Sequence, residues 1–160
     1  MAREDSQIRV TSSVLDRLID FEPRELHESP KTRTTSIKEL KQSVLRDLDW
    51  LLNTRHGFTV PEDLKEAVKS VICYGLPDFT ALSVKSQVEL NKLIKDIENS
   101  IRFFEPRFID LKISFEPVGD LDRQIRFRID ASLDVDPAPE PITFDTVLNS
   151  GSGAFSVIQK

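Results

Sequence analysis

The spacing of apolar residues changes at Pro106, and no other feature of the sequence constrains the fold as strongly. Before Pro106, apolar residues recur in steps of four and three, the period of an amphipathic helix. This helical series is Leu90, Ile94, Ile97, Ile101 and Phe104. After Pro106, apolar residues occupy every second position, as in a strand with one buried face. Proline disfavours helical backbone in the residue before it, so we expect a helix from about Ser83 to end at Glu105.

The alternation after Pro106 predicts three strands and a short fourth one. It runs through residues 109–115, 125–135, 142–148 and 154–158. Since all the predicted helices precede these strands, the expected fold class is α+β. We expect the N-terminal helices to pack on one face of a C-terminal antiparallel β-sheet of about three to four strands, and the other face to be polar.

Two further helices are predicted ahead of residue 83. One runs from Ser36 to Asn53, because apolar residues recur at helical spacing and Ser36 begins a capping-box pattern. The other runs from Pro61 to Tyr74, since proline is favoured early in a helix and Gly75 suits the position after its end.

The N-terminal region predicts a short helix followed by an extended arm. One of the serines at positions 12 and 13 can cap a helix that continues to about Ile19. Residues 21–36 then combine proline, serine, threonine and basic residues, a composition typical of a linker. We therefore divide the chain into residues 1–35, a helix with an arm, and residues 36–160, one α+β domain.

Composition indicates a soluble protein of a reducing compartment. The chain has 160 residues with 39% hydrophobic and 31% charged, and its apolar runs fall short of the roughly 20 residues that span a bilayer. The N-terminus mixes both charge signs and does not resemble a secretory leader. The single cysteine, Cys73, is expected on the buried face of a helix. A cytoplasmic location is expected.

The formal net charge of −5 argues against general binding to nucleic acid, which depends on neutralising phosphates. Arg123, Arg126 and Arg128 nevertheless cluster on one predicted strand. They are either solvated strand positions or a patch for an acidic partner.

Side chains that carry chemistry are sparse. His27 and His56 are the only histidines, and neither has the spacing of a metal site; a phosphate-binding glycine loop is also missing. We expect no cofactor, no metal and no small-molecule substrate. A carboxylate pair of the glycosidase type could use Glu98, Glu105 or Asp110, but 27 acidic residues make such a pair a common coincidence.

The segment Phe104-Glu105-Pro106-Arg107 stands out at the predicted helix–strand junction. Opposite charges on either side of a proline give a rigid turn that displays a carboxylate and a guanidinium. These groups can pair with each other in a structural turn, or they can bond to a partner protein. The same four residues recur at 21–24 with different flanks, so that copy is either coincidental or part of a docking arm.

The predicted C-terminal strand, after the Gly-Ser segment 149–153, leaves two alternatives open. It can complete its own sheet, or it can add to the sheet of a neighbouring subunit.

The chain resembles the TssE family, the small baseplate subunits of bacterial type VI secretion systems, which are related to the small baseplate wedge protein of contractile-tailed phages. The resemblance depends on five segments in order and extends over most of the chain. They are Ser13-Val14-Leu15-Asp16-Arg17-Leu18, Ser43-Val44-Leu45-Arg46-Asp47-Leu48 leading into Leu51-Leu52-Asn53-Thr54-Arg55, Ser70-Val71-Ile72-Cys73-Tyr74-Gly75-Leu76-Pro77-Asp78, Ile101-Arg102-Phe103-Phe104-Glu105-Pro106-Arg107-Phe108, and Asp136-Pro137 through Pro141-Ile142-Thr143-Phe144.

This resemblance implies a non-enzymatic subunit that joins wedge proteins of the TssF, TssG and TssK type to the first sheath ring, built from TssB- and TssC-type proteins. It implies no direct insertion into the membrane and a place in the envelope-docked baseplate on the cytoplasmic side. The Glu-Pro-Arg signature of the family corresponds to Glu105, Pro106 and Arg107, which together with Phe104 and Phe108 are the expected protein-binding residues.

Two other functions compete with this interpretation. One is a peptidoglycan-cleaving, lysozyme-like enzyme that would use Glu98 or Glu105. The other is a small regulatory module that binds another protein, as a related fold does in an anti-adaptor role.

Overall fold

The computed structural model describes residues 13–19, 33–57, 60–61, 64–79, 86–116, 124–149 and 151–159. Its elements follow in this order: α1 (Val14–Leu18), α2 (Arg33–Asn53), β1 (Arg55–His56), α3 (Lys65–Val68), the 3₁₀ turn η1 (Val71–Cys73), β2 (Leu76–Pro77), α4 (Gln87–Phe104), β3 (Phe108–Glu116), β4 (Gln124–Leu133), β5 (Glu140–Asn149) and β6 (Ala154–Gln159).

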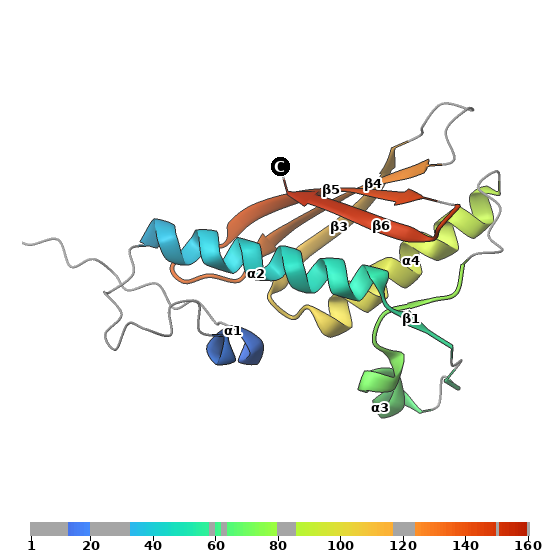
Figure 1. Ribbon diagram of the computed structural model, residues 1–160, viewed down its shortest axis with the longest axis horizontal. Helices are drawn as coiled ribbons and strands as arrows, with labels where there is room; N and C mark the ends of the chain where they lie inside the picture. The colour runs from blue at the N-terminus through green and yellow to red at the C-terminus, as the bar shows by residue number, and fades with distance from the viewer. Residues whose placement is uncertain are drawn as a thin grey trace, which may run out of the picture.

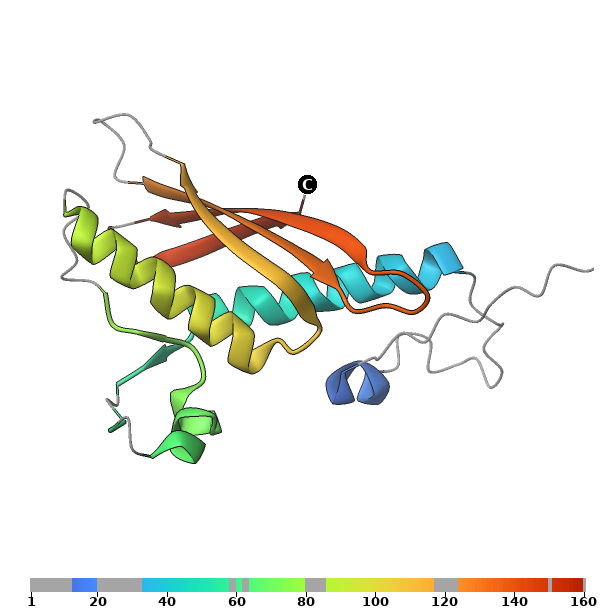
Figure 2. The same ribbon diagram turned by 180° about the vertical axis from the view of Figure 1, so that it is seen from behind.

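Two long helices and a four-stranded sheet form the body of the protein (Figure 1). The strands lie in the order β3-β4-β5-β6, and every neighbouring pair is antiparallel. The two long helices, α2 and α4, lie against the same face of the sheet, and no described helix covers the other face (Figure 2). The predicted α+β class, with helices first and a C-terminal antiparallel sheet, is confirmed.

Buried side chains alternate along the central strands as the sequence predicts. On β4 every second residue from Ile125 to Leu133 is buried, and on β5 every second residue from Ile142 to Leu148. Because Ile129 lies opposite Phe144, the two rows of side chains face the same side. The apolar faces of α2 and α4 complete this single core. The change of period at Pro106 is therefore a change from helix to strand within one core.

The ends of the long helices agree with the sequence better than their starts. Both predicted ends are confirmed, at Asn53 for α2 and before Glu105 for α4. α2 already begins at Arg33, so Ser36 lies in its first turn and is not the predicted N-cap. α4 begins after Ser86, whose hydroxyl accepts a hydrogen bond from the third helical residue, and not near Ser83.

The helix predicted from Pro61 to Tyr74 is wrong. The segment forms only the four-residue α3 and the turn η1, while Val71 is 83% and Ile72 is 55% exposed. Helical stability in proteins comes mainly from packing an apolar face against another element. The exposed Val71 and Ile72 lack such packing among the described residues. Cys73 accordingly lies in η1 and is partly buried; it is not on a buried helix face.

Gly75 holds the return of this segment to the end of α2. The amide of Leu76 donates to the carbonyl of Thr54 (2.9 Å), and β2 pairs in parallel with β1. Gly75 has φ +105°, and a Cβ built there would lie 2.5 Å from the Thr54 oxygen. A side chain at this position would force the two segments apart.

We expect Gly75→Ala to lower the free energy of unfolding by about 1–3 kcal/mol, because it combines a positive φ with a backbone clash. Urea unfolding followed by circular dichroism measures the loss. Gly57→Ala is the matched control: an added Cβ meets nothing within 4 Å there. A Gly75→Ala protein as stable as this control would contradict the strained close approach.

The C-terminal strand completes its own sheet. β6 pairs with β5 from Ala154 opposite Asn149 to Gln159 opposite Phe144. The sequence left two alternatives open for this strand. In the structure it pairs with its own chain. The side of β6 that faces away from β5, called the β6 edge below, is the outer edge of the sheet.

Candidate functional site

The turn between α4 and β3 reverses the chain within a few residues. The Glu105 amide closes the helix by donating to the Ile101 carbonyl (2.8 Å), and the Glu105 carbonyl accepts from the Phe108 amide (3.2 Å). The carbonyl of Arg107 accepts from the amide of Asp134, just beyond β4 (2.9 Å). The backbone of the turn is thus tied to both the helix and the sheet.

Glu105 and Arg107 pair with each other inside the protein. The Glu105 side chain is only 4% exposed and that of Arg107 only 13%. The Arg107 Nε lies 2.6 Å from Glu105 Oε1, and Nη2 bonds to Oε2, so that the guanidinium contacts both carboxylate oxygens. The local pairing that the sequence allowed is present, and both charged groups face inward.

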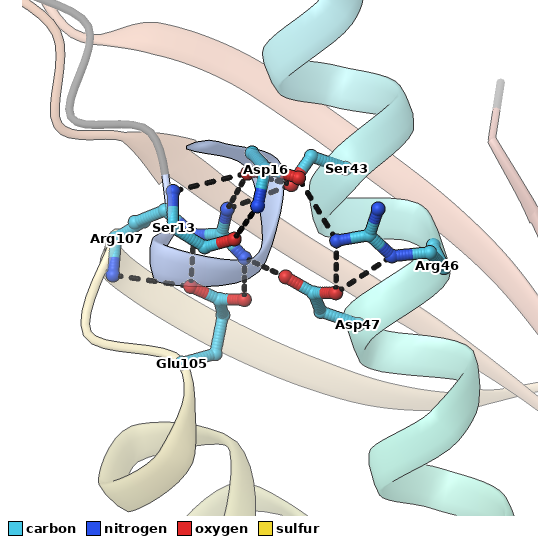
Figure 3. A network of polar contacts seen from close by, with 7 residues as sticks. All are labelled: Ser13, Asp16, Ser43, Arg46, Asp47, Glu105 and Arg107. Atoms are coloured by element: carbon cyan, nitrogen blue, oxygen red, sulfur yellow. Dashed lines mark hydrogen bonds and ion pairs between the residues drawn. The ribbon is translucent and has the colours of Figure 1, made fainter. Parts of the chain in front are cut away.

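Helix α2 supplies the next partners of Arg107 (Figure 3). Asp47 Oδ2 lies 2.7 Å from Arg107 Nη2, and the Ser43 hydroxyl accepts from Arg107 Nη1 at 3.1 Å. The other oxygen of Asp47 accepts from Arg46 Nη2 at 2.7 Å. Arg107 therefore joins the α4–β3 turn to the middle of α2.

Helix α1 is attached to the same cluster through Asp16. Its carboxylate accepts from the Ser43 hydroxyl at 2.6 Å and from Arg46 Nη2 at 2.9 Å, and lies 3.8 Å from Arg107. Ser13 caps α1 in a reciprocal capping box with Asp16. We call this set the junction network: Ser13, Asp16, Ser43, Arg46, Asp47, Glu105 and Arg107 (Figure 3).

The charges in the junction network perturb one another. Burial alone would raise the pKa of Asp16, but hydrogen bonds from Ser43, Ser13 and Arg46 outweigh it and lower the pKa from 3.8 to about 2. Burial lowers the pKa of Arg107, and Glu105 and Asp47 raise it well above its ordinary value. Burial, then Asp47 and Glu105, raise the pKa of the nearby Tyr74. The Asp16 carboxylate and the Arg107 guanidinium are thus held in their charged forms.

The expected protein-binding residues divide into an inner and an outer set. Glu105 is buried in the junction network, and Arg107 is largely so. The ring of Phe104 packs edge-on against Tyr74 (5.2 Å between centroids), and Phe108 packs near Phe144 (6.0 Å). Of the five residues, Pro106 is exposed, whereas the other four are buried or partly buried.

Sequence reasoning missed four members of the junction network: Asp16, Ser43, Arg46 and Asp47. A signal was available on α2, because residues three and four apart lie on one helix face. Ser43, Arg46 and Asp47 form such a polar group directly beside the apolar stripe. Their pairing with a turn 60 residues further along the chain has no signal in a single sequence.

Two of the three carboxylates considered for catalysis are paired with a neighbouring arginine. Glu98 pairs with Arg102 one turn further along α4 (2.7 Å), and Glu105 pairs with Arg107. Asp110 is exposed and has φ +54°, at the irregularity in β3. Asp is among the residues that tolerate this backbone conformation.

The other candidate residues lie away from the junction network or outside the described part of the chain. Arg128 pairs with Asp145 (3.3 Å) and Arg126 is exposed; Arg123, His27 and the second Phe-Glu-Pro-Arg at 21–24 lie outside the described residues. Within the described ranges, no group of three or more His, Cys, Asp or Glu side chains is placed to hold a metal ion. No described helix is both long and apolar enough to cross a bilayer.

We expect Arg107→Met to lower the free energy of unfolding by about 3–5 kcal/mol, because it leaves the Glu105 carboxylate buried without its cation. Chemical unfolding of the purified variant measures the change. Arg102→Met is the matched control, since its 55% exposed side chain forms a surface pair worth about 0.5 kcal/mol. Equal losses for both variants would show that the junction network adds no more than a surface ion pair.

A second prediction concerns α1 and acid. Because the pKa of Asp16 is about 2 in the folded protein, its contribution is complete above about pH 4 and is lost as pH falls through 2. We expect an NMR titration of the Asp16 carboxyl to show this low midpoint. Ser43→Ala removes a hydrogen-bond donor and should move the midpoint toward 3.8. A wild-type midpoint near 3.8 would mean that α1 is not held by Ser43 and Arg46.

Comparison with known proteins gives a family match. The model of the family described as baseplate wedge protein gp25 matches residues 38–138, from the first turns of α2 to the loop beyond β4. The match includes the Glu105–Arg107 turn and confirms the resemblance to TssE-type baseplate subunits. No curated protein and no solved structure matches the chain. Since the matched region covers well over half of its residues, the chain belongs to the family of baseplate wedge protein gp25.

Proposed function

We propose that this protein is a non-enzymatic baseplate subunit of a type VI secretion system, which links wedge proteins to the first ring of the contractile sheath and helps to start sheath polymerisation. The observation that carries the proposal is the gp25 family match on a fold whose helices and sheet are locked together by Arg107. A subunit that transmits position between two partners needs such a rigid connection.

The helical side is the surface proposed for the wedge proteins, of the TssF, TssG and TssK type. Large apolar side chains are exposed on helical elements there: Val14, Leu18, Trp50, Val71, Ile72 and Phe103. Pro106 is exposed in the turn that follows α4. In this proposal Glu105 and Arg107 act from inside, by fixing the turn that presents Pro106, Phe104 and Phe108 to the partner.

The sheet is the surface proposed for the sheath proteins, of the TssB and TssC type. The sequence of β6, from Ala154 to Gln159, carries no charged residue, and β6 is an edge strand. Edge strands accept extended segments of other proteins through main-chain hydrogen bonds. The two surfaces lie on different parts of the molecule, so both partners can be bound together at the cytoplasmic side of the envelope.

A structural role suits the chemistry of the junction network better than peptidoglycan cleavage does. A general acid must carry a proton that it can donate. Both oxygens of Glu105 instead accept hydrogen bonds from the Arg107 guanidinium, so the carboxylate is already engaged in a structural pair.

We expect the tagged protein to co-purify with both wedge and sheath proteins from cells with the system assembled. Pro106→Asp, which spares the junction network, should reduce recovery of the wedge proteins at least tenfold and leave the sheath contact. Deletion of residues 150–160 should do the reverse. Circular dichroism confirms that each variant is folded, and Asn91→Asp, at an exposed polar position on α4, is the control.

Recovery of both partners by every variant would contradict the assignment of the two surfaces. A soluble one-to-one complex with a single regulatory protein would contradict the baseplate function. Turnover of peptidoglycan that is lost in Glu105→Gln would contradict the non-enzymatic assignment.

A further inference from the structure

The side chain of Asn53 imitates a neighbouring strand at one point of the β6 edge. Its Nδ2 donates to the carbonyl of Phe155 (3.1 Å), and its Oδ1 accepts from the amide of Phe155 (2.9 Å). In an antiparallel sheet one residue of an adjacent strand makes this same pair of bonds. A single side-chain amide therefore satisfies the backbone of Phe155.

These bonds show which backbone groups of β6 face outward. Phe155 lies opposite Leu148 of β5, yet both of its backbone groups point to Asn53, so this is a pair without mutual hydrogen bonds. Backbone direction alternates with a period of two along a strand. Val157 and Gln159 therefore also direct their N–H and C=O groups away from β5.

Asn53 is held in place by the end of α2. Its Nδ2 also lies 3.1 Å from the Asp49 Oδ1, one turn earlier in the helix. Two residues later, Arg55 donates to the carbonyls of Leu52 (2.6 Å) and Gly153, which binds the end of α2 to the turn before β6. Its guanidinium also stacks on Phe155 (5.6 Å to the ring centroid). The amide is thus a positioned group, although it lies at the surface.

The opposite edge of the sheet is less suited to accept a strand. β3 has an irregular register between Ile109 and Lys112, with Asp110 at φ +54°. Arg102 Nη2 lies 3.4 Å from the carbonyl of Leu111. Irregular backbone and charged side chains are devices that protect an edge from strand addition. β6 has a regular register with β5 and no charged side chain.

The end of the β6 edge away from Asn53 leads into an open hollow. It has a volume of about 400 Å³ and is lined by residues that include Lys41, Thr143 and Gln159. The backbone of β6 is therefore bonded to Asn53 at Phe155, and Gln159, at the other end of the described strand, lines the hollow.

We propose that Asn53 sets the register in which an extended segment of the sheath partner adds to β6. The segment forms hydrogen bonds with the outward backbone groups of Val157 and Gln159 and passes into the hollow. It cannot bond to Phe155, because Asn53 already bonds to both backbone groups of that residue. The identity of the partner rests on the proposed function. The two hydrogen bonds between Asn53 and Phe155, called the cap below, are a property of the chain itself.

Hydrogen exchange measured by NMR on the free protein tests the cap. We expect the Phe155 amide to exchange slowly and the Val157 amide to exchange rapidly. Asn53→Ala should accelerate hydrogen exchange of the Phe155 amide by about tenfold. Asn91→Ala, which removes an exposed amide bonded to Gln87, is the matched control and should change neither amide. Slow exchange of Val157, or no acceleration of Phe155, overturns the cap.

The same measurement in complex with the sheath proteins tests the register. We expect the amides of Val157 and Gln159 to become protected from exchange, and the exchange rate of the Phe155 amide to stay unchanged. Val157→Pro should weaken binding at least tenfold, because it removes an outward donor without breaking a bond to β5. Thermal unfolding confirms that this variant is folded.

The remaining outcomes are distinct. Unchanged binding by folded Val157→Pro, or displacement of Asn53 from Phe155 in the complex, overturns the register. No sheath binding by the wild-type protein overturns the proposed function and the partner, while exchange in the free protein still decides the cap. Concentration-dependent protection of Val157 in the protein alone would identify a second copy as the occupant and overturn the sheath assignment.

Discussion

The guanidinium of Arg107 is the group on which the arrangement of this protein depends. It neutralises Glu105, which is only 4% exposed, and it reaches Asp47 in the middle of α2. A carboxylate buried this deeply costs several kcal/mol unless a cation and hydrogen bonds compensate for it. Because the pair lies where α4 becomes β3, the same contacts fix the angle between the helices and the sheet. Asp16 then attaches α1 to the same group of charges.

This rigid junction connects two surfaces of different character. The helical side exposes large apolar side chains such as Trp50 and Phe103. The sheet side ends in β6, an uncharged edge strand. The proposed function uses this difference, because one partner would bind by burying side chains and the other by extending a sheet. The junction network makes the relative position of the two surfaces a fixed property of the subunit.

The β6 edge is protected at one end and exposed at the other. A strand such as β6, with Phe155, Val157 and Ile158 and no charge, would pair readily with other chains. Asn53 satisfies the backbone at one end, and α2 lies alongside (Figure 1). Protection of one end and exposure of the other restricts the ways in which a strand can add. In the proposed register, selectivity at this edge thus depends on Asn53, a helix residue 102 positions away from Phe155 in the sequence.

Local pattern alone determined the two long helices, the four strands that follow them, the buried face of the sheet and the end of α4 at Glu105, because periodicity and proline geometry act within a few residues. Only the tertiary structure decided that Glu105 and Arg107 face inward, that Asp16, Ser43 and Asp47 join them, and that Asn53 caps β6. It also decided that Val71 and Ile72 are exposed although their spacing is helical. These outcomes depend on which distant segments meet, and single-sequence periodicity carries no information about such contacts.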